Sequence, residues 1–249
     1  MRILITTIRA TTTMKGSCLQ PSLEDKTTRL RESVLKWYRK NGRYFPWRQT
    51  SNPFHVLLAE YLLRQTQATR LVKPYLELTS KYPDADSLAR ADVGELRAWF
   101  KPLGLVKRAD CLVQTARLLV DNYQGQVPKD VRALTSMPGM GIYSSRAVLC
   151  LAFGKPYPMI DEGSGRVLRR VLGIDHKGPA YCDSNLLQIA ERIVPQASCR
   201  EFNFGLIDIA ATYCKVTNPK CAECPLTVVC SFVGKDFTTE RNKYIIRTN

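Results

Sequence analysis

The chain has 249 residues, of which 45% are hydrophobic, and it contains no apolar run of transmembrane length. These values are typical of a globular protein and exclude a membrane-spanning chain. The 37 Lys and Arg residues against 22 Asp and Glu residues give a net charge of +15, which favours a polyanionic partner. No basic amphipathic segment carries a lipid-anchor signal, so nucleic acid is preferred over an anionic membrane surface.

The nine cysteines could form the disulfide framework of a secreted protein, but no signal peptide precedes them. Residues 1–13 are rich in Thr and contain no acidic residue, and they resemble a transit peptide only weakly. Disorder, or a start codon placed ahead of Met14, is the preferred interpretation of this segment. Five cysteines occur singly, mostly in apolar surroundings, and are interpreted as buried reduced thiols, which predicts a reducing compartment.

Beyond residue 28, apolar residues recur at helical spacing, and no run alternates with a period of two for long enough to form a strand. Gly and Pro separate the helical runs, and Asn52 before Pro53 is a typical pair of cap and first-turn residues. The pattern predicts an all-α protein with short connections. The predicted helices cover about residues 28–41, 54–68, 71–82, 87–100, 108–123, 130–136, 143–153, 163–171, 183–194 and 199–213.

A glycine-containing turn, Met137-Pro138-Gly139-Met140-Gly141, lies between two of these helices. Two glycines on either side of one apolar residue allow a tight turn. The backbone N–H groups of such a turn, at a helix N-terminus, could hold a phosphate group. A plain connection between two helices is the alternative interpretation.

A carboxylate, Asp161, follows the apolar pair Met159-Ile160, directly ahead of the helix predicted from Gly163. Asp161 could be the N-cap of that helix. An ionised capping aspartate could also face a developing cation, so the structural and the chemical interpretation are compatible.

Four further cysteines are crowded into 17 residues with the spacing C-x6-C-x2-C-x5-C. Thiolates at this spacing form a metal-ligand set, which suits a cubane iron–sulfur cluster or, less well, zinc. Lys220 and two prolines, Pro219 and Pro225, lie among them, so we expect a rigid and positively charged loop. The predicted ligands are Cys214, Cys221, Cys224 and Cys230.

Together these features resemble the helix-hairpin-helix base-excision DNA glycosylases that carry an iron–sulfur loop of the endonuclease III type. The resemblance covers about residues 29–232 and rests on the hairpin, on Asp161 placed 18 residues after Tyr143, and on the cysteine loop. The closest likeness is to the mismatch thymine glycosylases, which act on T·G and U·G pairs, followed by the adenine glycosylases of the MutY type. Motifs that look like the thymine enzymes are Phe45-Pro46-Trp47-Arg48, Glu60-Tyr61-Leu62-Leu63-Arg64, Cys150-Leu151-Ala152-Phe153-Gly154-Lys155 and Cys199-Arg200-Glu201-Phe202-Asn203-Phe204-Gly205-Leu206.

The resemblance implies two helical lobes. A six-helix barrel containing the helix-hairpin-helix is expected over residues 52–157, and an iron–sulfur cluster domain over residues 29–51 and 158–232. Residues 1–28 are expected to form a disordered segment, and residues 233–249 a basic tail. The implied setting is the prokaryotic cytoplasm, at the nucleoid, with the protein acting as a monomer on double-stranded DNA that contains a mismatched base.

The resemblance also implies a reaction. Family members that cleave the strand have a Lys two residues after the second hairpin glycine, and its amine forms a Schiff base with the sugar. This chain has Tyr143 there, and a phenol cannot form an imine, so hydrolysis by water without lyase activity is expected. Asp161 would stabilise the cationic sugar. Glu60, a lone acid in an apolar helix, would line the base pocket, with a satisfied core carboxylate as the alternative.

DNA contacts are implied at three places. Gln65 matches the position that fills the gap left by a flipped base, and Arg64 lies beside it. The hairpin residues Pro138, Gly139, Met140 and Gly141 would contact DNA, with backbone amides around Gly139 and Gly141 holding phosphate and hairpin carbonyls as candidate ligands of a monovalent cation. Lys215 and Lys220 of the cysteine loop would contact the DNA backbone.

Other interpretations stay open at this point. Gln65 and Gln67 look like the adenine enzymes, whereas Leu105 stands where those enzymes typically carry Tyr. The alternative function is therefore an adenine glycosylase without the C-terminal domain that reads oxidised guanine. A non-catalytic DNA-binding module with a structural cluster, and a nucleic-acid protein with a zinc loop, are alternatives from other classes.

Overall fold

The computed structural model describes residues 23–63, 67–175 and 178–232, and within these ranges the chain is helical and contains no strand. The predicted all-α fold is therefore confirmed. Short 3₁₀ turns at Pro46–Arg48, Ala68–Leu71, Lys101–Leu103, Ala180–Cys182 and Cys221–Glu223 join the longer elements. The α-helices are α1 (Leu23–Asn41), α2 (Pro53–Leu62), α3 (Val72–Lys81), α4 (Ala85–Ala89), α5 (Val93–Phe100), α6 (Val106–Tyr123), α7 (Val131–Thr135), α8 (Ile142–Phe153), α9 (Glu162–Leu172), α10 (Ser184–Ile193) and α11 (Cys199–Thr212).

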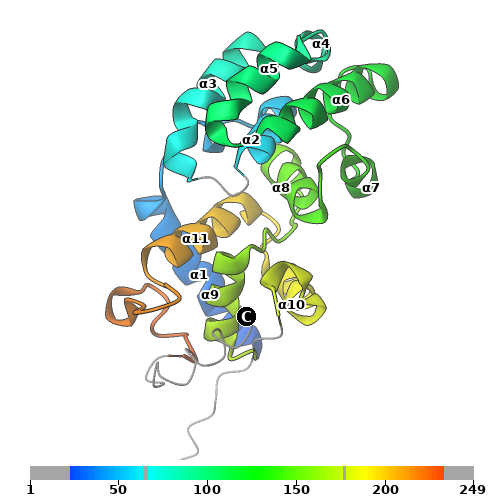
Figure 1. Cartoon of the computed structure of the whole chain (residues 1–249). Helices are drawn as coiled ribbons and strands as arrows, with labels where there is room; N and C mark the ends of the chain where they lie inside the picture. The colour runs from blue at the N-terminus through cyan, green and yellow to red at the C-terminus, as the bar shows by residue number, and fades with distance from the viewer. Residues whose placement is uncertain (1–22, 64–66, 176–177, 233–249) are drawn as a thin grey trace, which may run out of the picture.

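The helices form two lobes, each with its own hydrophobic core (Figure 1). Helices α2 to α8 build the larger core, and α1 and α9 to α11 build the smaller one together with the cysteine loop. The chain passes between the lobes twice, once after α1 and once after α8. None of the helices in the described ranges combines the length and the apolar character needed to cross a membrane.

Close packing of α1 on α11 depends on a glycine. A Cβ atom built on Gly205 of α11 would lie 2.6 Å from Cγ1 of Val34 in α1, a separation that side chains do not tolerate. The absence of a side chain at this position lets the two helices approach closely.

Three predicted boundaries differ from the structure. The helix expected to reach residue 68 ends at Leu62, because Arg108 Nη1 donates to the terminal carbonyls of Tyr61 at 2.7 Å and Leu62 at 3.4 Å. The helix expected over 87–100 is two helices, because the Asp92 side chain accepts from Glu95 N at 2.7 Å and starts a new one.

The third difference concerns the N-terminal segment, predicted to be disordered up to residue 28. Helix α1 begins at Leu23, and two acidic residues, Glu24 and Asp25, lie in its first turn, where negative charge interacts favourably with the helix dipole. Residues 1–22 and the predicted basic tail at 233–249 lie outside the described residues.

Candidate active site

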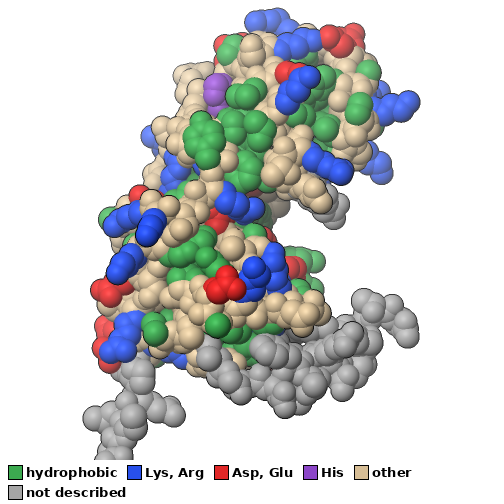
Figure 2. All heavy atoms as spheres, turned by 90° about the vertical axis from the view of Figure 1, so that its left-hand side faces the viewer, with side chains coloured by type: hydrophobic (Ala, Val, Ile, Leu, Met, Phe, Trp, Pro, Cys, Tyr) green, Lys and Arg blue, Asp and Glu red, His purple; other side chains and the backbone are tan. Residues whose placement is uncertain are grey.

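A cavity of about 340 Å³ lies between the two lobes, within the range of about 300–1,000 Å³ that is usual for sites of small ligands. Its wall is mostly apolar and carries a few ionisable side chains, a composition that suits a planar heterocycle. Figure 2 shows Lys and Arg side chains on both lobes around hydrophobic patches. The lining residues are Arg43, Phe45, Trp47, Arg48, Val56, Ala59, Glu60, Leu63, Ala68, Tyr143, Leu151, Met159, Asp161, Phe204 and Ile207.

Glu60 reaches the cavity from α2, a helix whose residues are nearly all buried. The helix starts at a side-chain cap, in which Asn52 Oδ1 accepts from Phe54 N at 2.9 Å and His55 N at 3.2 Å. Only 5% of Glu60 is exposed. A carboxyl group therefore lies in a largely apolar wall of the cavity. That this cavity receives a base stays a prediction.

Asp161 is the N-cap of α9, and only one of its carboxylate oxygens is used for capping. Oδ1 accepts from Ser164 N at 2.7 Å and lies 2.8 Å from Ser164 Oγ, and the N–H of Asp161 donates back to Ser164 Oγ at 2.9 Å. Oδ2 accepts no hydrogen bond from the residues that the structure describes. Asp161 is therefore the helix cap that the sequence suggested, and its carboxylate also lines the cavity, where a developing cation could lie.

Tyr143 enters from the first turn of α8. Burial, and after it the negative charges of Glu60 and Asp161, hold the pKa of its phenol well above the ordinary value. The hydroxyl is therefore protonated at neutral pH and available as a hydrogen-bond donor. Glu60 of α2, Tyr143 of α8 and Asp161, the N-cap of α9, all line this one cavity.

The floor of the cavity holds a buried ion pair that the sequence analysis did not identify. Arg48 and Asp208 form a bidentate pair, with Nη1–Oδ2 at 2.8 Å and Nη2–Oδ1 at 2.9 Å, and Arg43 adds contacts from its N–H and guanidinium. Burial raises the pKa of Asp208, but the hydrogen bonds and charges of the two arginines outweigh it and hold the pKa below its usual value. Asp208 could have been noticed in the sequence, because it is an acidic residue within the apolar run of α11, the same pattern that identified Glu60.

Arg200 of α11 forms hydrogen bonds with two parts of the cavity wall. Its Nη2 donates to the carbonyls of Arg48 at 2.6 Å and Thr50 at 2.7 Å, and its Nη1 donates to the carbonyl of Leu151 at 2.9 Å. Arg48 and Thr50 lie in the first segment that crosses between the lobes, and Leu151 lies near the end of α8, so Arg200 fixes the first crossing segment and the last turn of α8 to one helix. Because Arg48 and Leu151 both line the cavity, these bonds also fix its shape.

The predicted hairpin joins α7 to α8. Gly139 has a φ of 74°, and a Cβ there would lie 3.2 Å from Cys111 Sγ, so both backbone conformation and space require glycine. The hydroxyl of Tyr61 in α2 donates to the carbonyl of Pro138 at 2.5 Å and braces the turn from below. Gly139 and Gly141 are exposed, so the turn is open to a ligand. The predicted phosphate and cation contacts at Pro138, Gly139, Met140 and Gly141 stay predictions.

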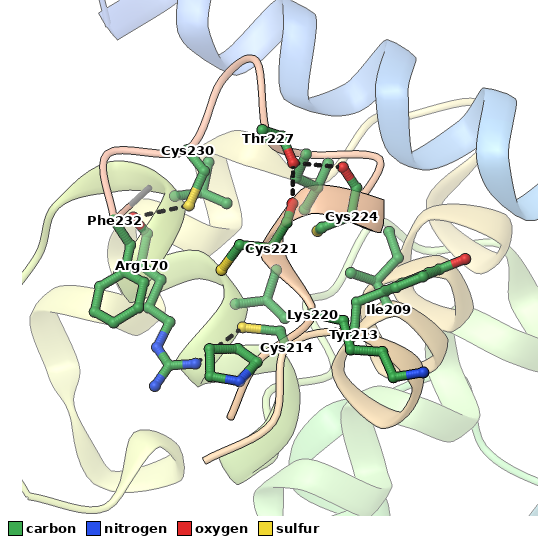
Figure 3. Close-up of a pocket in the computed structure, with 14 residues that line it drawn as sticks. Arg170, Ile209, Tyr213, Cys214, Lys220, Cys221, Cys224, Thr227, Cys230 and Phe232 are labelled. Atoms are coloured by element: carbon green, nitrogen blue, oxygen red, sulfur yellow. Dashed lines mark hydrogen bonds between the residues drawn. The ribbon is translucent and has the colours of Figure 1, made fainter. Parts of the chain in front are cut away.

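The four cysteines of the C-terminal loop line one pocket against α9 and α11 (Figure 3). Two arginines of α9 hold the loop, since Arg166 Nε donates to the carbonyl of Cys214 at 2.8 Å and Arg170 Nη1 to that of Lys215 at 2.7 Å. Burial, followed by the charges of the other three thiols, raises the pKa of Cys224 to about 11, although the N–H of Leu226 opposes this.

The chemistry of the donor set, four thiols that line one pocket, suits a cubane iron–sulfur cluster or zinc. Among the described residues, no three His, Cys, Asp or Glu side chains are grouped so that they could hold one metal ion. The cluster stays a prediction.

Of the remaining residues predicted to contact DNA, two lie within the described part of the chain and two lie outside it. Lys215 and Lys220 are exposed, and the ammonium group of Lys215 donates to the carbonyl of Ala211 at the end of α11. Arg64 and Gln65 lie outside the described residues.

Comparison with known proteins places this geometry in a family. Residues 58–193 match the model of the HhH-GPD superfamily base excision DNA repair proteins, which is more than half of the chain, and the protein belongs to that family. The predicted family is thereby confirmed, and with it the two-lobed helical fold.

Individual relatives refine the comparison. The chain is 40% identical to a thymine/uracil-DNA glycosylase of Pyrobaculum aerophilum over 214 residues, covering 84% of this chain and 93% of the relative. It is 30% identical to an adenine DNA glycosylase of Mycobacterium tuberculosis, covering 78% of this chain and 64% of the relative. The solved structure of a thermostable thymine-DNA glycosylase superposes with a TM-score of 0.79 at 35% identity, covering 84% of this chain and 97% of that one.

Proposed function

We propose that the protein is a DNA glycosylase that flips thymine or uracil out of a mispair with guanine and hydrolyses its N-glycosidic bond, without cleaving the strand. The observation that carries the proposal is the cavity in which Glu60, Tyr143 and Asp161 meet, next to an exposed helix-hairpin-helix. Similarity to thymine/uracil-DNA glycosylases at 40% identity, against 30% for an adenine DNA glycosylase, supports the choice of base.

In the proposed reaction the duplex bends and the mispaired base enters the cavity, at a cost of a few kcal/mol that a weak pair reduces. The C1′–N bond breaks, and the base leaves with the bonding electrons and takes up a proton from solvent. The positive charge that develops on the sugar lies near the carboxylate of Asp161, whose Oδ2 is not used by the helix cap. Water then adds to C1′, and its proton is taken up by the carboxylate or by solvent.

A panel of duplexes tests the choice of base. Duplexes with T·G, U·G, A·G or A opposite oxidised guanine are incubated with the purified protein, each with and without alkali. Release of thymine and uracil opposite guanine is expected, with little release of adenine. Preferential release of adenine would replace this proposal by the adenine-glycosylase alternative, and release of no base would favour a binding module.

We expect no lyase activity, because the phenol of Tyr143 cannot form an imine and stays protonated. Product strands should remain intact until alkali or heat is applied. Substitution of Tyr143→Lys should introduce some strand cleavage, since an amine would then stand beside the sugar. Trapping of the wild-type protein on DNA by borohydride would contradict the expectation.

The cysteine loop is proposed to hold a cubane iron–sulfur cluster through Cys214, Cys221, Cys224 and Cys230. The cluster would keep the loop rigid and present Lys215 and Lys220 to the DNA backbone, and no redox step is required. The protein is expected to act as a monomer in the prokaryotic cytoplasm.

Metal analysis tests the cluster. Protein purified without air should be brown and contain about four irons per chain. The variant Cys224→Ser should lose iron, whereas the control Cys182→Ser, an exposed cysteine outside the loop, should retain it. Stoichiometric zinc without iron would show that the loop is a zinc site.

A further inference from the structure

The segment between α8 and α9 carries Met159 and Asp161 to the cavity, yet its backbone is not part of a helix. Within the segment, the N–H of Lys155 donates to the carbonyl of Leu149 and that of Tyr157 donates to the carbonyl of Lys155. Both bonds lie at its beginning. Asp161 itself is bound to α9 through its cap, whereas the backbone at residues 157–159 that leads to it is held by contacts from another element.

Asn203 of α11 supplies these contacts. Its Oδ1 accepts from the N–H of Met159 at 2.9 Å, and its Nδ2 donates to the carbonyl of Tyr157 at 2.9 Å. Its third neighbour is Cys150 of α8, whose Sγ lies 3.3 Å from Nδ2. The amide is fully buried, so no water competes for its donors and acceptor. One side chain thus holds the segment on both sides of residue 158.

The anchored backbone lies close to the carboxylate. Met159, whose N–H is held by Asn203, is two residues ahead of Asp161 in the chain. The hydroxyl of Ser164 lies 2.8 Å from Asp161 Oδ1 and 3.1 Å from the carbonyl of Met159, and its one proton can be donated to only one of them at a time. A buried amide with three neighbours in good geometry is also costly to replace, since each partner would be left unsatisfied.

We propose that Asn203 is a positioning residue for the proposed glycosylase reaction, on which this inference rests: it holds the 157–159 backbone so that Asp161 lies at the reacting sugar. Asn203 does not line the cavity and touches no substrate. A carboxylate displaced by about 1 Å still caps α9 but stabilises the cation poorly, and a misplacement of that size can lower a rate about 10²-fold.

The test measures base release under single-turnover conditions, with enzyme in excess over a T·G duplex. In Asn203→Ala and in the milder Asn203→Ser, the rate constant should fall about 10²-fold, because a rate constant reports the geometry of the folded fraction and not its amount. Affinity for an uncleavable duplex should change by no more than about threefold, because the phosphate contacts come from other elements.

The matched control is Asp183→Asn. Asp183 is also buried, caps α10 and pairs with Arg169 at 2.7 Å, and neither residue lines the cavity. Its loss should lower stability while leaving the rate constant unchanged. A second readout follows hydrogen exchange at the amide of Met159, which should be protected in the wild type and exchange faster in Asn203→Ser.

The possible results separate the inference about Asn203 from the proposed function. A folded Asn203 variant that releases base at the wild-type rate, or an unchanged Met159 amide in Asn203→Ser, would overturn the inference while leaving the proposed function intact. An equal loss of rate in Asp183→Asn would also overturn it, since general destabilisation would then explain both. If the wild type releases no base, the proposed function fails, and the exchange measurement still tests whether Asn203 anchors the segment.

Discussion

Substitution of Asp161→Asn is expected to reduce base release by at least about 10²–10³-fold, which corresponds to a loss of roughly 3–4 kcal/mol of transition-state stabilisation. Asn keeps the shape of the side chain, and its Oδ1 can accept the bond from Ser164 N that begins α9. Folding and the cysteine loop should therefore survive. Only the negative charge beside the sugar is lost, so the deficit should appear in the chemical step.

Binding separates this prediction from a general defect. Affinity of the Asp161→Asn variant for mismatched DNA should hold or rise, because one charge that repels phosphate is gone. Single-turnover kinetics and a titration with an uncleavable duplex measure the two quantities independently. A folded variant that releases base at a near wild-type rate would mean that Asp161 is only a helix cap.

The largest effect on stability is expected for Asp208→Ala, at roughly 3–5 kcal/mol of the free energy of unfolding. Asp208 is fully buried, and its removal leaves the guanidinium of Arg48, of which 8% is exposed, without its carboxylate partner. Denaturant unfolding measures the change. A suitable control is Glu201→Ala in the same helix, which breaks the exposed pair with Arg39 and should cost no more than about 1 kcal/mol. Similar losses in both variants would contradict the burial argument.

The same pair predicts a dependence on pH. The pKa of Asp208 is lowered in the folded state, so its stabilising contribution is complete above the ordinary pKa of aspartate, about 4. That contribution should be lost as the pH falls through the lower folded-state pKa. Unfolding curves of the wild type and of Asp208→Ala should therefore converge at acid pH.

The parts of the fold that could be predicted from the sequence are those set by local signals. Asn52 caps α2 and Asp161 caps α9, because a capping side chain acts on residues two or three positions ahead. The end of α2 could not be predicted, because Arg108, a residue of α6, determines it. Periodicity within a helix carries no information about which distant side chain will meet its end.

The same limit applies to the candidate site. Glu60, Tyr143 and Asp161 were identified from the sequence through motif and resemblance, and the structure places them in one cavity. The floor was missed, because Arg48 and Asp208 are 160 residues apart and each is an ordinary charged residue in its own segment. Only the packing of α11 between the crossing segments brings them together.

The bonds from α11 to both crossing segments have a consequence for how the two lobes respond to a ligand. Hinge motion needs connections that can change their backbone angles freely. Here Arg200 holds the first connection at the carbonyls of Arg48 and Thr50, and Asn203 of the same helix holds the second at residues 157 and 159. Two lobes connected in this way are expected to move little toward each other. With the proposed substrate, the DNA duplex and not the protein would then be the partner that changes shape. Selection among base pairs would then depend on how readily each site in the DNA kinks and opens, a form of indirect readout made before any base is contacted.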